Sequence, residues 1–210
     1  MTALAGHYVH IARRPAKGFA ELASDARALR LGALALASNA LLYTLVYAFL
    51  ILGHGRPTAF HPWLAIDPEV YYRWNVFLVA PSMALSWIVA SAVAQLLARG
   101  LGGSGSFEST TAVLGFGAAI ASWWTLLHDL VTSSLGAAHV IDQREYEDAL
   151  NAPTVFRAML WLLMAAYLVA FVVYFARGIE AVHRVSRRRS LAIGAAAFFA
   201  YQLVFLIFNR

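Results

Sequence analysis

The chain has 210 residues, of which 61% are hydrophobic and only 13% are charged, and its formal net charge is +5. Soluble domains carry about 25% charged residues, so this composition excludes an ordinary soluble domain and predicts a membrane protein with several spans. Cysteine is absent, which excludes disulfides and thiolate metal sites. The basic balance does not require nucleic acid as a partner, because positive residues that flank membrane spans account for it.

The first 30 residues are too polar to cross a membrane, and from Pro15 they predict one short helix. Apolar residues recur there at helical spacing, with charged residues elsewhere around the wheel. An amphipathic helix at the membrane interface and an ordinary solvated helix both fit this pattern, and we favour the interfacial one. The positions of the apolar stripe are Phe19, Leu22, Ala26 and Leu29.

Five apolar stretches follow, each long enough to cross roughly 30 Å of hydrocarbon. These stretches are residues 31–52, 76–98, 111–135, 156–176 and 191–208. The expected fold class is therefore all-α, a polytopic membrane protein with five transmembrane helices. In this division residues 1–30 form the N-terminal segment with its short amphipathic helix, and residues 31–210 form the membrane domain.

Small residues mark two places where the chain is expected to pack or turn closely. In the second stretch Ser82, Ser86, Ala90 and Ala94 lie four apart, which lets another helix approach. The connection 99–110 holds four glycines and predicts a tight turn. A phosphate-binding loop is the weaker interpretation, because the Walker lysine is missing and no strand precedes the glycines.

The distribution of charge predicts the topology. Eleven of the 16 Lys and Arg residues fall on the side that holds the N-terminus, and five fall on the other side. The positive-inside rule then places the N-terminus in the cytoplasm and the C-terminus outside, in the cytoplasmic (inner) membrane. The acidic segment 136–155 falls outside, where His139, Asp142 and Glu145 share a spacing of three. We interpret that spacing as a solvated helix face rather than a cation site, and no metal is expected.

Several of these features together resemble bacterial Yip1-domain proteins. The shared features are Arg14-Pro15 followed by Phe19 and Leu22 before the first span, Pro81 early in the second span, and LLARGLGGSGSF at 96–107 joining spans two and three. The resemblance covers nearly the whole chain and includes the five spans and the cytoplasmic N-terminus. It implies a small integral membrane protein without a shared catalytic motif. In eukaryotes the family is linked to Golgi vesicle traffic and Rab GTPase partners.

His128 and Asp129 are the best candidates for chemistry, because an ionisable residue inside a membrane is a functional hypothesis by default. Such a pair could relay protons, or bind a cation or a lipid headgroup. Trp124 lies one turn earlier and could stack on His128, whereas adjacent His128 and Asp129 need not touch. The alternative is that both lie near the outer interface, where polar groups cost little.

Two further sets of residues have both a structural and a functional interpretation. Asn39 and Gln95 predict interhelical hydrogen bonds, or they line a polar path. An arginine cluster anchors the topology and could also bind anionic lipid headgroups. Its members are Arg184, Arg187, Arg188 and Arg189.

The function expected from these residues is a non-enzymatic, Yip1-like protein that organises the membrane or binds lipid or protein partners. The expected partners are membrane lipids and a second copy of the chain or another membrane protein, with no cofactor and no catalytic residue. The alternative is a small oligomeric transporter or channel for an ion, proton or small solute. Its polar path would join Asn39, Gln95, His128 and Asp129 in one water-lined cavity. An intramembrane enzyme ranks last, because only one ionisable pair is present.

Overall fold

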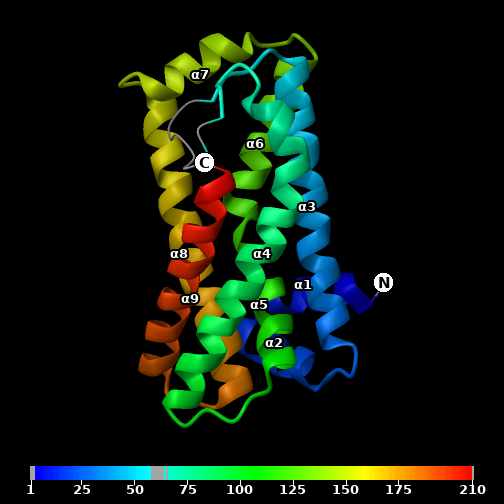
Figure 1. Ribbon diagram of the computed structural model, residues 1–210, viewed down its shortest axis with the longest axis vertical. Helices are drawn as coiled ribbons and strands as arrows, with labels where there is room; N and C mark the ends of the chain where they lie inside the picture. Colours follow the sequence, from blue (N-terminus) through cyan, green and yellow to red (C-terminus); the bar gives the residue numbers. More distant parts are fainter. Residues whose placement is uncertain (1–2, 58–63, 65, 210) are drawn as a thin grey trace.

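The computed structural model describes residues 3–57, 64 and 66–209, and the regular structure in that part of the chain is entirely helical (Figure 1). This confirms the all-α class. The connection expected at 53–75 lies partly outside the described residues. The helices are α1 (Ala3–Arg13), α2 (Pro15–Ser24), α3 (Ala28–Leu52), α4 (Tyr71–Gly100), α5 (Phe107–Ala121), α6 (Trp123–Ala137), α7 (Gln143–Asn151), α8 (Val155–His183) and α9 (Arg187–Phe208).

Four helices, α3, α4, α8 and α9, are each long and apolar enough to cross a membrane. They are longer than the apolar stretches in the sequence, because each helix continues beyond its apolar stretch through polar residues at one or both ends. The span expected at 111–135 is not one continuous helix, because two helices, α5 and α6, occupy it with a bend of 46° between them. Taken as one broken span, the bent pair makes the fifth crossing.

Polar side chains support this bend at Ser122. The Ser122 hydroxyl donates to the Ala118 carbonyl at 2.8 Å, a bond that competes with regular helix geometry. From α3, the Asn39 side-chain amide donates to the Ala119 carbonyl at 2.7 Å. Tyr43, one turn further along α3, lies 3.2 Å from the Thr125 hydroxyl. Helix α3 therefore holds the broken span on both sides of its bend.

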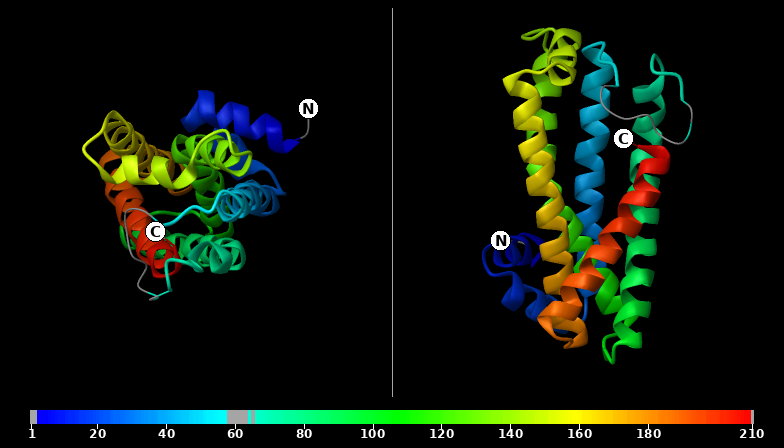
Figure 2. Two further views of the ribbon diagram at one scale, coloured as in Figure 1. Left: turned by 90° about the horizontal axis from the view of Figure 1, so that it is seen from above. Right: turned by 90° about the vertical axis from the view of Figure 1, so that its left-hand side faces the viewer.

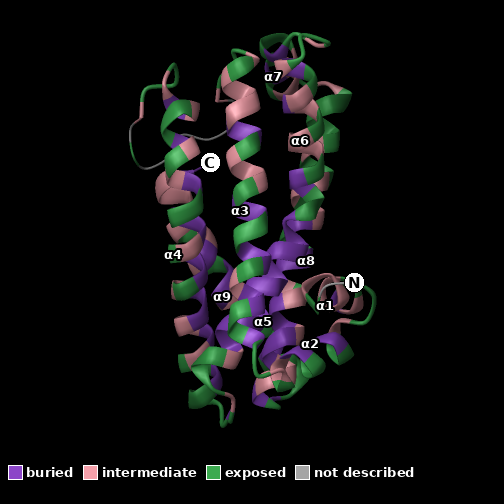
Figure 3. Ribbon diagram, turned by 90° about the vertical axis from the view of Figure 1, so that its right-hand side faces the viewer, coloured by how far each residue is buried: buried purple, intermediate pink, exposed green. Residues whose placement is uncertain are grey.

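Helix α5 is the centre of the bundle, and it approaches α3 through glycines. Every residue from 110 to 121 is buried. A Cβ built on Gly32 of α3 would lie 2.5 Å from the Ala112 carbonyl oxygen. A Cβ on Gly115 would lie 2.7 Å from the Gly32 oxygen. Figure 3 shows this concentration of buried residues around α5, while the outer helices keep exposed faces.

The exposed faces of the outer helices are apolar, as a lipid-facing surface requires. Large hydrophobic side chains on four different spans are more than half exposed. Examples, one on each span, are Leu41, Phe77, Leu162 and Phe199. Such a surface in water would be a large apolar patch, so these residues agree with a bundle surrounded by hydrocarbon.

The row of small residues on α4 is buried, as its spacing predicted. Ser82, Ser86, Ala90 and Ala94 are at most 2% exposed. Asn209, just beyond α9, donates to the Ser82 hydroxyl at 2.6 Å. The row therefore forms a close helix contact, with α9 reaching it at Ser82.

The N-terminal segment contains two helices where one was predicted. Arg14 has φ −141° and ψ 71°, a non-helical conformation that the following proline favours, so α1 ends and Pro15 begins α2. The predicted stripe is also shorter, because Leu29 belongs to α3 and is 40% exposed. Ile11, Phe19 and Leu22 are fully buried in one cluster with residues of α3 and α5. The two helices form an elbow that lies across the side of the bundle (Figures 1 and 2).

Candidate functional site

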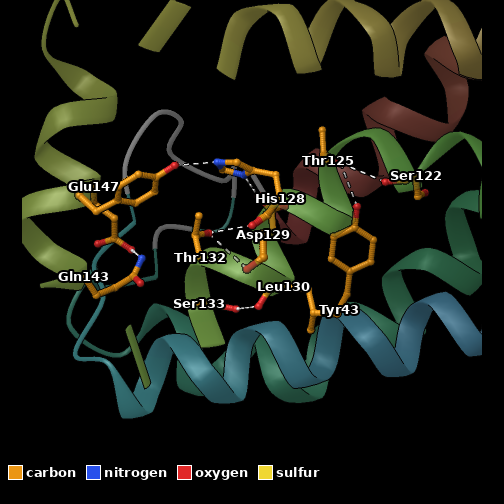
Figure 4. Close-up of polar contacts among 11 residues, drawn as sticks. Tyr43, Ser122, Thr125, His128, Asp129, Leu130, Thr132, Ser133, Gln143 and Glu147 are labelled. Atoms are coloured by element: carbon orange, nitrogen blue, oxygen red, sulfur yellow. Dashed lines mark hydrogen bonds and ion pairs between the residues drawn. The ribbon is translucent and has the colours of Figure 1, made fainter. Parts of the chain in front are cut away.

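His128 lies at the centre of a polar cluster where α7 passes over α6 (Figure 4). Its Nδ1 is 2.9 Å from Asp129 Oδ1, and its Nε2 is 2.7 Å from the Tyr146 hydroxyl of α7. The neighbouring His128 and Asp129 side chains thus do touch, although helical geometry alone did not require it. The side chain of Asp129 is the more exposed of the two, at 36% against 12%.

Both ring nitrogens of His128 have a hydrogen-bond partner. Burial, and then the nearby Asp129 carboxylate, raises the pKa of the Tyr146 hydroxyl above its ordinary value, so this hydroxyl keeps its hydrogen. The Asp129 carboxylate accepts, so His128 Nδ1 carries a hydrogen and donates to it, while Nε2 shares a hydrogen bond with the Tyr146 hydroxyl. The result is a hydrogen-bonded chain of Tyr146, His128 and Asp129. Such a chain orients the imidazole and fixes α7 on α6.

Trp124 does not stack on His128. The aromatic partner of His128 is Tyr146, with ring centroids 6.2 Å apart, and Trp124 is 52% exposed. Tyr146 also packs edge-on against Phe156 at the start of α8, with centroids 5.6 Å apart. Tyr146 was not predicted, because nothing in the sequence relates it to His128, which lies 18 positions earlier.

Replacing Tyr146 with phenylalanine is expected to loosen α7 while the membrane helices stay folded. The substitution keeps the ring contacts but removes the hydroxyl that is hydrogen-bonded to His128, a loss of about 1 kcal/mol. Hydrogen exchange of the backbone amides of α7 should then be several-fold faster. Tyr174→Phe serves as a matched control, since that ring packs against Phe19 far from α7. Unchanged exchange in Tyr146→Phe would show that the hydroxyl does not hold the helix.

The acidic residues of α7 cap the helix and bind the backbone after α3. Asp142 caps the helix by accepting from the amides of Arg144 and Glu145. Glu147 is 5% exposed and accepts from the backbone amide of Arg56 and from Gln143. Within the described part of the chain, no three acidic or histidine side chains gather as a metal site would need.

Gln95 lies at the other end of the bundle, in a ring of hydrogen bonds that holds the glycine-rich turn. It donates to the Gly105 carbonyl at 3.1 Å and accepts from the Thr110 hydroxyl at 2.8 Å. His183 Nε2 lies 2.8 Å from that hydroxyl, and the Gly105 amide donates to His183 Nδ1 at 3.2 Å. The turn is thereby fixed to the end of α8. His183, only 2% exposed, was not predicted, because the sequence before the arginine run gives no sign of burial.

Asn39 is 1% exposed and is also hydrogen-bonded to the N-terminal elbow. Tyr8 of α1 donates to its Oδ1 at 3.4 Å and accepts from the Trp123 indole at 3.0 Å. Burial raises the pKa of Tyr8 to about 12, against the smaller opposite effect of Trp123. Asn39, Gln95 and His128 therefore make their hydrogen bonds with separate partners at different levels of the bundle. The structure does not bring them together, and the polar path of a transporter stays a prediction.

The arginine cluster lies beside the glycine-rich turn, where α8 ends and α9 begins. Arg184 ends α8 in the left-handed conformation, with φ 55°. The Arg189 guanidinium donates to the Leu101 carbonyl at 3.3 Å. All four side chains are exposed, and no described carboxylate forms an ion pair with them. The members are Arg184, Arg187, Arg188 and Arg189.

Long apolar helices, a lipid-facing apolar surface and a fully buried central helix define the class: a polytopic α-helical membrane protein. The sequence model of the Yip1 domain matches residues 9–209, nearly the whole chain. The chain therefore belongs to the Yip1 family, as the resemblance indicated. Searches of the curated proteins and of the solved structures gave no significant match.

Proposed function

We propose that this protein is a non-enzymatic membrane protein that gathers anionic lipids at its arginine-rich end and so organises the bilayer around it. The observation that supports the proposal is the exposed arginine cluster at one end of the bundle. A basic group near an anionic membrane surface contributes about 1 kcal/mol. Guanidinium groups with no acidic partner in the described chain can make bidentate bonds to phosphate.

The orientation that this proposal needs has the N-terminus, the glycine-rich turn and the arginine cluster in the cytoplasm. The positive-inside count supports it, and helix α7 with its acidic residues then lies outside. In this arrangement the arginines face the leaflet surface from the ends of α8 and α9.

Cysteine labelling tests this orientation, because the native chain has no cysteine to interfere. Ser104→Cys in the glycine-rich turn is expected to resist a membrane-impermeant maleimide in intact cells and to react after lysis. Val140→Cys, before α7, is 68% exposed and should react in intact cells. The opposite pattern would invert the topology and remove the basis of the proposal.

Lipid enrichment tests the function itself. The wild type, in nanodiscs of mixed phosphatidylglycerol and phosphatidylcholine, should bind phosphatidylglycerol preferentially, more weakly at high salt. Arg187→Gln/Arg188→Gln is expected to lower the preference by about tenfold or more, since each arginine contributes about 1 kcal/mol. The control is Arg144→Gln/Arg157→Gln at the opposite end, which should lower the preference less, because both guanidinium groups already donate to backbone carbonyls, those of His54 and Asn151. Equal preferences in all three proteins would contradict the proposal.

A further inference from the structure

The elbow between α1 and α2 holds a surface pocket that the arginine cluster does not share. The pocket has a volume of about 300 Å³. Its lining combines apolar and cationic groups, as a site for an amphipathic anion requires. The lining residues are Gly6, Val9, His10, Arg13 and Arg14.

Two arginines at this pocket have no acidic partner in the described chain. Arg13 and Arg14 are exposed, and neither forms an ion pair with a described carboxylate. His10, by contrast, is 2.6 Å from Glu21 of α2, and this contact fixes one wall of the pocket. Two arginines that line one pocket can both donate to the oxygens of one phosphate group.

The floor of the pocket is apolar and open. Val9 is 44% exposed, and a Cβ built on Gly6 would meet nothing within 4 Å. A purely ionic ligand would gain nothing from these residues, whereas the glycerol and upper acyl carbons of a lipid would cover them.

Close packing and hydrogen bonds to the bundle hold the elbow that carries the pocket. Gly18 of α2 lies directly against Ile11 of α1, where a Cβ would come within 2.8 Å of the Ile11 backbone. Ile11, Phe19 and Leu22 are fully buried, and Tyr8 bonds to both Asn39 and Trp123. A site whose support is fixed before binding loses less conformational entropy when the ligand arrives.

We infer that this pocket binds the phosphate of one anionic glycerophospholipid, with Arg13 and Arg14 on the phosphate and Val9 beneath the glycerol. The inference rests on the proposed function, in which this end of the protein faces an anionic leaflet. It adds a single defined site to the diffuse attraction of the arginine cluster.

Two substitutions distinguish lipid binding in this pocket from attraction of lipid by positive charge in general. Gly6→Leu fills the pocket but keeps both arginines, and it favours helix α1, because glycine is a poor helix former. Arg13→Gln/Arg14→Gln keeps the pocket but removes its charge. Arg187→Gln/Arg188→Gln is the matched control, since it removes equal charge elsewhere.

The experiment is native mass spectrometry of the full chain, titrated in detergent with dioleoyl-phosphatidylglycerol, dioleoyl-phosphatidylcholine or glycerol 3-phosphate. Gly6→Leu and Arg13→Gln/Arg14→Gln should each weaken the first bound phosphatidylglycerol by about tenfold. Arg187→Gln/Arg188→Gln should keep this first lipid and weaken only the later ones.

The other outcomes overturn the inference in distinguishable ways. Wild-type binding of phosphatidylglycerol by Gly6→Leu would show that the pocket is not the site, while the proposed function would stand. Displacement of the first lipid by equimolar glycerol 3-phosphate would assign the pocket to a soluble phosphate. A wild type with no preference for phosphatidylglycerol over phosphatidylcholine would remove the proposed function as well.

Discussion

Gly32→Ala is expected to lower the free energy of unfolding by about 1–3 kcal/mol, the usual cost of forcing an extra methyl group into a packed core. The new Cβ would lie 2.5 Å from the carbonyl oxygen and 2.8 Å from the Cα of Ala112. Both are backbone atoms of the buried helix α5, so no side chain can rotate away. The helices α3 and α5 must separate, and the contacts around their crossing weaken together.

Thermal unfolding in detergent, followed by size-exclusion chromatography, measures this effect. The matched control is Gly100→Ala at the end of α4, where a Cβ would meet nothing within 4 Å. The control should be as stable as the wild type or slightly more stable, because alanine favours a helix over glycine. If Gly32→Ala were as stable as Gly100→Ala, the close α3–α5 crossing would be wrong.

Asn39→Leu is expected to lower the free energy of unfolding by about 1–3 kcal/mol, because it leaves a buried carbonyl without its donor. Leucine has nearly the same size, so the change removes hydrogen bonds rather than volume. The Ala119 carbonyl at the α5–α6 bend loses the amide that lies 2.7 Å away. Tyr8 loses its acceptor as well, so α1 should dock less firmly.

Two measurements separate these consequences. The thermal midpoint reports the bend, and hydrogen exchange of the α1 amides reports the docking of the elbow. Tyr8→Phe should speed exchange in α1 while changing the midpoint less than Asn39→Leu. Ser38→Ala is the control, since the Ser38 hydroxyl bonds only to Ala35 of its own helix in the described structure. A midpoint for Asn39→Leu equal to that of Ser38→Ala would contradict the role given to Asn39.

Hydropathy was sufficient to predict the class and the approximate positions of the spans, because hydrocarbon demands long uninterrupted apolar helices. The broken third span was not predicted. No proline marks the bend, and its polar support comes from Asn39 and Tyr43 on a distant helix. The second N-terminal helix was also missed, although Pro15 did mark where α2 begins.

The candidate residues were found more readily than their partners. A polar residue within a long apolar stretch can be recognised from the sequence alone. Asn39, Gln95 and His128 were singled out in this way. Their partners Ala119, Gly105 and Tyr146 are ordinary residues that only the tertiary packing brings near. The sequence also does not show how far apart these polar residues lie, so they could be joined in one transporter path. In the structure they lie at different levels of the bundle.

A flux assay in proteoliposomes tests most directly whether this protein binds lipid rather than conducts solute. The wild type and His128→Ala/Asp129→Asn would be reconstituted at equal density with ion- and proton-sensitive dyes. Both proteins should give the flux of empty liposomes, while the wild type still enriches phosphatidylglycerol. Wild-type flux above that background, lost in the double variant at equal expression, would contradict the proposed function and make the His128 cluster part of a conducting path.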